Sequence, residues 1–73
     1  MDIHAIRKDL LRRLPPLVPR TKVEALTGGL INAKTLANKD SLGFGPKQRL
    51  KFRGKVCYPR EALVDWIISQ LEV

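Results

Sequence analysis

The chain has 73 residues and one cysteine, Cys57. This length allows a single hydrophobic core, and a lone cysteine excludes a disulfide framework, so we expect one small fold in a reducing compartment. His4 is the one other soft metal ligand, and no metal site is predicted. No apolar run approaches the roughly 20 residues that cross a bilayer, which predicts a cytoplasmic protein with no membrane partner.

Basic residues outnumber acidic ones, with 14 Lys and Arg against 7 Asp and Glu and a net charge of +7. The excess is concentrated in residues 43–60, which hold six basic residues and no acidic one, whereas residues 61–73 hold three acidic residues and no basic one. Such a distribution favours a polyanionic partner. A surface that is basic for solubility is the simpler alternative.

Residues 2–14 have the pattern of an amphipathic helix. Asp2 is a suitable N-cap, and Pro15 and Pro16 end the pattern because the residue before a proline leaves the helical region. Its apolar residues recur at helical spacing: Ile3, Ile6, Leu10 and Leu14. We treat residues 1–17 as an N-terminal helical extension that either packs on the core or meets a second copy.

A second, shorter helix is expected within residues 19–29, where the main domain, residues 18–73, begins. Thr21 with Glu24 three residues later predicts a capping box, and Val23 and Leu26 predict one buried side. Two consecutive glycines, Gly28 and Gly29, then end the helix, and at least one of them is expected in the left-handed conformation.

The stretch NAKTLANKD predicts a third helix over residues 32–40, capped by Asn32. At helical spacing its residues divide into two faces. One face is small and apolar apart from one acid: Ala33, Leu36, Ala37 and Asp40. The other face is polar and basic: Lys34, Thr35, Asn38 and Lys39.

Residues 47–58 alternate as in a β-hairpin, with a turn at Arg53–Gly54. Its basic residues are Lys47, Arg49, Lys51, Arg53 and Lys55. Pro59 then opens a last helix over residues 60–72, whose apolar stripe is expected to anchor the core. The stripe consists of Leu63, Trp66, Ile67 and Leu71, and is widened by Val64 and Ile68.

Two helices joined by a glycine turn form a helix-turn-helix, in which the second helix enters the DNA major groove. Asn, Lys and Thr are suited to base edges, so Lys34, Thr35 and Asn38 are expected to contact bases and Lys39 a phosphate or flanking base. The basic hairpin is expected to grip phosphates or reach the minor groove. Arg20 and Lys22 are secondary phosphate candidates, because helix N-termini favour anions.

The chain also resembles the excisionase-like winged helix-turn-helix family, within the MerR-type superfamily. The resemblance rests on VEALTGG, on NAKTLANKDSLGFGP and on RLKFRGKVCYPREALVDWI, about 50 of the 73 residues. It implies a mainly α fold with a β-hairpin wing, a reading helix at 32–40 and a wing at 47–58. It also implies a recombination directionality factor or a small transcriptional regulator. The N-terminal helix is extra, and the reading helix lacks the aromatic or arginine residues often found there.

No catalytic constellation, cofactor motif or small-molecule site is evident, so no enzyme is predicted. The sequence favours double-stranded DNA as the partner, together with a second copy or a recombinase. The alternative is a basic adaptor that docks through helix 2–14 on a recombinase or another acidic partner. An RNA-binding protein is a further alternative, although the expected signatures and stacking aromatics are missing.

Overall fold

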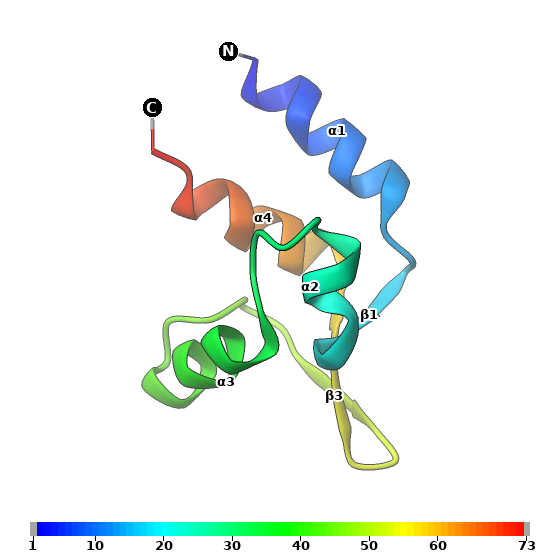
Figure 1. The fold of residues 1–73 in the computed structure, drawn as a ribbon, viewed down its shortest axis with the longest axis vertical. Coiled ribbons are helices and arrows are strands. Elements are labelled where there is room, and N and C mark those ends of the chain that lie inside the picture. Colours follow the sequence, from blue (N-terminus) through cyan, green and yellow to red (C-terminus); the bar gives the residue numbers. More distant parts are fainter. Residues whose placement is uncertain (1, 73) are drawn as a thin grey trace.

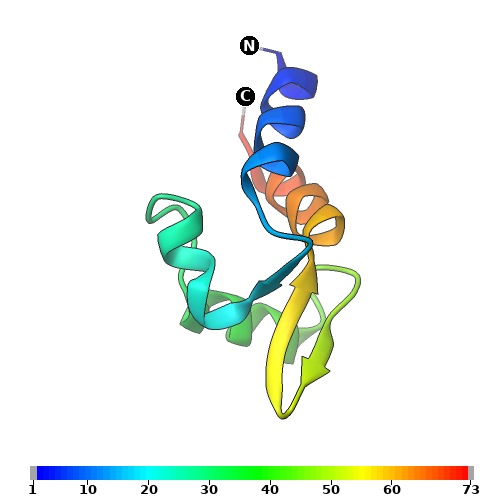
Figure 2. The same cartoon turned by 90° about the vertical axis from the view of Figure 1, so that its right-hand side faces the viewer.

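The structure is a computed structural model that describes residues 2–72. In that part of the chain, the fold consists of four α-helices, one short 3₁₀ helix and a three-stranded antiparallel sheet (Figures 1 and 2). The helices are α1 (Ile3–Arg13), η1 (Arg20–Lys22), α2 (Val23–Leu26), α3 (Ala33–Leu42) and α4 (Arg60–Gln70). The strands are β1 (Leu17–Pro19), β2 (Leu50–Phe52) and β3 (Lys55–Pro59).

Helix α1 forms where the sequence predicted it. The Asp2 side chain caps it by accepting hydrogen bonds from the backbone N–H groups of His4 and Ala5. Leu14, the residue before Pro15, adopts an extended conformation and ends the helix. Figure 1 shows α1 lying beside α4 at the end of the molecule that holds both termini.

The contact between α1 and α4 combines apolar packing with one ion pair. Leu10 and Leu11 pack against the core, and Leu14 is buried within it. Arg7 Nε lies 2.9 Å from Asp65 Oδ1 on α4, an exposed ion pair of small expected energy. The apolar side of the N-terminal helix is therefore used, at least in part, inside the fold.

Strand β1 was not predicted from the sequence. It pairs antiparallel with β3, with Val18 opposite Tyr58 and Pro19 opposite Cys57, so that β3 is the central strand in the order β1-β3-β2. The boundary expected between residues 17 and 18 falls inside this strand. Pro19 is compatible with its place because β1 is an edge strand, where a missing backbone donor is tolerated.

The hydrophobic core lies between one face of the sheet and the helices. Val18 and Tyr58 come from the sheet, and both are fully buried. The helices supply Val23 from α2, Leu36 from α3, and Leu63, Val64 and Ile67 from α4. Leu36 of α3 and Tyr58 of β3 belong to the same core, so the position of α3, the predicted DNA-reading helix, is set relative to the sheet.

Two expectations for the short second helix are wrong. Thr21 does not cap it, because residues 20–22 already form a 3₁₀ turn that runs directly into α2, and no side-chain cap bond forms at either start. Val23 is buried as expected, but Leu26 is 40% exposed. Four residues make barely more than one turn, so only one side chain of α2 reaches the core.

Helix α4 buries a different subset of residues from the one expected. Leu63 and Ile67 are buried together with Val64, whereas Trp66 is only partly buried and Leu71 follows the end of the helix. The indole Nε1 of Trp66 donates a 2.7 Å hydrogen bond to the carbonyl of Phe44. Trp66 thus ties α4 to the segment that leaves α3.

Candidate nucleic-acid interface

Helix α3 presents its polar face to solvent because its two ends and its inner side are fixed. The Asn32 side chain accepts a 2.8 Å hydrogen bond from the Thr35 N–H and caps the start. Leu36 and Asp40 are buried on the inner side. Gly43, with φ of 82°, forms the left-handed cap at the end. The division into two faces predicted from the sequence is confirmed.

The turn between α2 and α3 uses the left-handed region that favours glycine. Gly28 has φ of 66° and Gly29 has φ of 86°, as predicted for the end of the second helix. The Gly29 N–H donates a 2.8 Å hydrogen bond to the Glu24 carbonyl, which closes this turn. The chain then reverses within a few residues and enters α3.

The outward side chains of α3 are the ones predicted to read bases. Lys34, Thr35 and Asn38 are exposed, and Lys39 is partly buried. None of these four side chains makes a hydrogen bond or an ion pair within the described residues. Their donors and acceptors are therefore available to a ligand.

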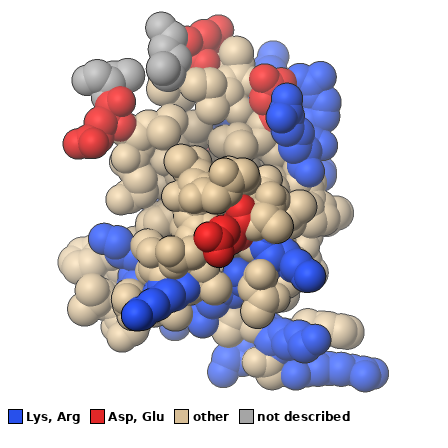
Figure 3. Space-filling view, viewed as in Figure 1, with Lys and Arg blue, Asp and Glu red and all other residues tan. Residues whose placement is uncertain are grey.

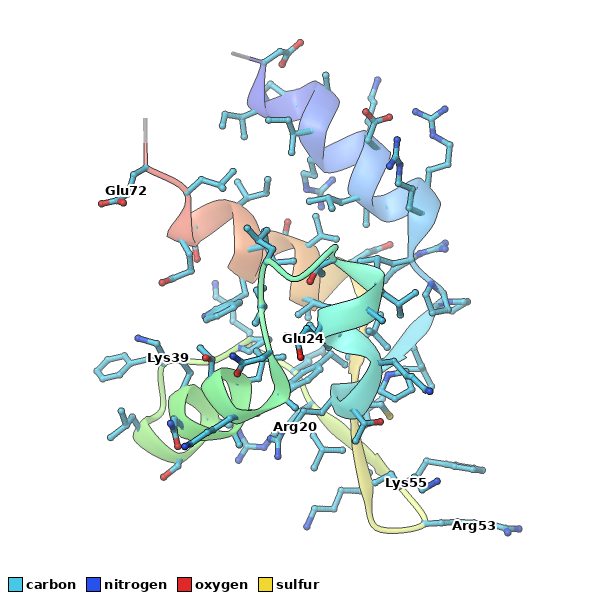
Figure 4. The ribbon with its side chains drawn as sticks, in the orientation of Figure 1. Arg20, Glu24, Lys39, Arg53, Lys55 and Glu72 are labelled. Atoms are coloured by element: carbon cyan, nitrogen blue, oxygen red, sulfur yellow. The ribbon has the colours of Figure 1, made fainter. Side chains whose placement is uncertain are left out.

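The hairpin of β2 and β3 turns at Arg53–Gly54 as predicted. Both residues have positive φ, 52° and 81°, which matches the twist of a two-residue β-hairpin turn. Lys51, Arg53 and Lys55 are exposed on it, and Figure 4 shows Arg53 and Lys55 at its far end. The strands begin later than the predicted 47–58, since β2 starts at Leu50. Lys47 and Arg49 therefore lie in the link from α3, and both are exposed.

A buried polar network joins the last part of α3 to the sheet. The carboxylate of Asp40 is 8% exposed as a residue, and its Oδ2 accepts 2.6 Å hydrogen bonds from both Arg20 Nη2 and Tyr58 Oη. Arg20 Nε donates a further bond of 3.0 Å to Tyr58 Oη. Burial, aided by the hydrogen bond to Asp40, raises the pKa of Tyr58 to about 12.

The second oxygen of Asp40 completes the link toward the hairpin. Oδ1 has no hydrogen-bond partner, but Arg49 Nη1 lies 3.6 Å from it. Gly45 passes so close that a Cβ there would lie 2.0 Å from the same oxygen. One carboxylate thus approaches two points of the link between α3 and the hairpin, Gly45 and Arg49.

In this network Arg20 has a different role from the one expected. Arg20 was a secondary phosphate candidate, but its guanidinium bonds Asp40 and Tyr58, and its side chain is 22% exposed. Lys22, the other secondary candidate, is exposed in η1. Sequence reasoning missed Asp40 and Gly45 as positioning residues. The signal present in the sequence was Asp40 itself, an acid on the apolar face of the predicted helix. Burying a carboxylate costs free energy unless it is paired, so its position indicated a partner.

Figure 3 shows how charge is distributed over one face of the molecule. Basic side chains gather over α3 and the hairpin in the lower part of that view. Acidic side chains lie near the termini and at one position in the middle, and a second basic group lies along α1. The residues of this second group are Lys8, Arg12 and Arg13, all exposed. We call the outward polar residues of α3 together with the basic residues of 47–55 the basic surface: Lys34, Thr35, Asn38, Lys39, Lys47, Arg49, Lys51, Arg53 and Lys55.

Comparisons with protein-family models, with curated proteins and with solved structures gave no match. Within residues 2–72, no helix has the length and apolar character needed to pass through a membrane. Over the same residues, no group of three or more His, Cys, Asp or Glu side chains is placed to hold a metal ion. The basic surface is therefore judged on its own geometry and charge.

Proposed function

We propose that the protein is a winged helix-turn-helix that binds double-stranded DNA and has no enzymatic activity. In this proposal α2, the glycine turn and α3 are the helix-turn-helix, and the hairpin of β2 and β3 is the wing. The observation that carries the proposal is the basic surface. It combines the polar side chains of α3, which have no partner within the described residues, with the cations of the hairpin. Asp40 joins these two elements through its contacts with Tyr58 and Arg49.

The chemistry of the surface suits a duplex in two ways. Lys34, Thr35 and Asn38 carry the donors, acceptor and methyl group that recognise base edges in the major groove. Lys51, Arg53 and Lys55 are placed to neutralise phosphates, which positions a protein without reading sequence. Arg20 is left out of this surface, because it holds Asp40 and Tyr58.

The adaptor alternative has less support from the geometry. Docking through helix 2–14 would use its apolar side, yet Leu10, Leu11 and Leu14 already pack against this chain's own core. The resemblance to excisionase-like proteins supports a recombination directionality factor or a small transcriptional regulator as the cellular role. A module of this size buries a small DNA interface, so a second copy or a partner protein is expected to add affinity.

The proposal is tested by fluorescence anisotropy of a labelled mixed-sequence duplex over a series of salt concentrations. We expect binding that weakens steeply with salt, because phosphate neutralisation releases counterions. Lys51→Ala and Arg53→Ala should each reduce the slope of log K against log salt by about one. Lys8→Ala on α1 is the matched control and should leave the slope unchanged. Absence of binding at low salt would refute the proposal.

A further inference from the structure

Phe52, at the end of β2, is an aromatic side chain that the core does not use. It is 67% exposed and directly precedes the two-residue turn at Arg53–Gly54. A large apolar side chain gains little from folding when most of its surface stays in water. Its contribution to the stability of this fold is therefore small, and its place on the hairpin calls for another account.

The strand register defines the direction in which Phe52 projects. Phe52 pairs with Lys55, and Lys51 pairs with Val56 on the opposite face of the hairpin. Val56 packs against the core. Phe52 and Lys55 therefore lie on the face turned away from the core, and Lys51 lies on the core-facing side.

The charged neighbours of Phe52 on the hairpin are all cationic. Arg53 Cζ lies 5.8 Å from the centroid of the Phe52 ring, Lys55 is directly across the hairpin and Lys51 precedes it. No acidic residue occurs in residues 43–60. Figure 2 shows the hairpin extending beyond the rest of the fold. A polyanion drawn to these cations meets the Phe52 ring among them.

We propose that Phe52 is an apolar wedge that enters the DNA minor groove beside the site read by α3 and helps to bend the duplex. This inference rests on the proposed function. A hairpin that enters a groove tip first turns one face toward each sugar-phosphate wall. Phe52 lies directly before the turn, so in this orientation its ring is near the tip and within reach of the base steps at the floor of the groove.

The dimensions of the groove favour a wedge. Two paired strands are about 4.8 Å apart before side chains are added, whereas the minor groove is only about 6 Å wide. The groove must widen to admit the hairpin, and an inserted apolar ring supports widening by partly unstacking a base step. Pyrimidine–purine steps unstack most readily, so Phe52 gives a preference for such a step at a position that no hydrogen bond reads.

A protein partner is the competing occupant of this face. Leu17 and Leu50 lie on the same side of the sheet and are 46% and 50% exposed. What favours DNA at Phe52 is the charge around it, because Arg53 lies over its ring and Lys55 is directly across the hairpin. Leu17 lies at the other end of the sheet, opposite Pro59.

The test compares Phe52→Ala with Phe44→Ala, which removes the same side chain at an equally exposed position. Phe44 is 69% exposed and contacts Trp66 through its backbone carbonyl, which alanine retains. Duplexes labelled at both ends report bending by fluorescence energy transfer, and anisotropy reports affinity. Thermal unfolding of both variants verifies that each is folded.

We expect the wild-type protein to bend the duplex and Phe52→Ala to bend it less, with affinity lowered on the order of ten-fold. The salt slope should not change, since no charge is removed. Phe44→Ala should resemble the wild type.

If the wild type binds but Phe52→Ala bends and binds the duplex equally well, the wedge is refuted while DNA binding stands. A loss of affinity with an unchanged bend also refutes the wedge. If no duplex binds the wild type, the proposed function fails and this inference fails with it.

Discussion

Tyr58 Oη donates a 2.6 Å hydrogen bond to Oδ2 of Asp40, so the central strand β3 is joined to the last part of α3 through a buried contact. The two elements that carry the basic surface are thereby held in one orientation. Arg20 adds a second donor to the same oxygen, and Arg49 approaches the other oxygen. A DNA-binding surface divided between a helix and a hairpin depends on such a link, because both parts must meet one duplex.

Asp40→Asn is expected to lower the free energy of unfolding by about 2 to 3 kcal/mol. The change leaves the Arg20 guanidinium without its charged partner, which is costly for a largely buried group. Urea denaturation monitored by Trp66 fluorescence measures the change. Asp9→Asn is the control, since Asp9 pairs with exposed Arg12 on the surface and should cost less than about 0.5 kcal/mol. Equal stability of the wild type and Asp40→Asn would contradict the role given to this network.

Stability should fall at alkaline pH because of Tyr58. Its pKa is raised from 10.0 to about 12, mainly by burial, so the folded state holds the phenol proton more tightly than the unfolded state. The resulting stabilisation is complete below about pH 10 and is lost as the pH rises toward about 12, with a total of about 3 kcal/mol. Tyr58→Phe carries no titrating phenol. Its unfolding free energy should show a shallower dependence over this pH range, and parallel curves would argue against the prediction.

Gly45→Ala is expected to destabilise the fold by about 1 to 3 kcal/mol through overpacking. The added Cβ would lie 2.0 Å from Asp40 Oδ1 and 3.2 Å from the Asp40 backbone nitrogen. Asp40→Ala removes the first contact, so the two substitutions together should cost less than their sum. A double-mutant cycle by chemical denaturation measures this coupling. Full additivity would mean that the close approach of Gly45 to Asp40 has no energetic effect.

Asn38→Ala is expected to weaken sequence discrimination more than overall DNA binding. A bidentate amide contact to adenine accounts for about 1 to 3 kcal/mol of preference between bases. A preferred site selected from random duplexes is compared with single-base variants for the wild type and Asn38→Ala. The prediction is that the mutant loses preference at one position. Gln70→Ala, an exposed amide at the end of α4, should keep the full preference, and a uniform loss across all sites in Asn38→Ala would speak against base reading.

Much of the fold could be predicted from local signals in the amino-acid sequence. The Asn32 cap, the left-handed Gly28 and Gly29, and the Arg53–Gly54 turn were all predicted, because each depends on the conformation of a few adjacent residues. Burial of Leu36 followed from helical spacing alone.

Features that depend on distant residues were missed. Strand β1 has only three residues, and the last of them is Pro19. It forms because it pairs with β3, about 40 residues away in the sequence. The donors to Asp40, Arg20 and Tyr58, are separated from it by 20 and 18 residues. No spacing rule links these positions, so Arg20 was assigned to the surface. Exposure of Leu26 reflects the shortness of α2, which the apolar pattern does not reveal.

The measurement that most directly tests the central claim is a titration of isotope-labelled protein with mixed-sequence duplex DNA, followed through backbone amide shifts at two salt concentrations. DNA binding through the basic surface predicts shifts clustered in residues 32–40 and 47–56 that diminish as salt is raised. Shifts that are absent at low salt, or confined to residues 2–14, would contradict DNA binding and favour a protein partner on α1.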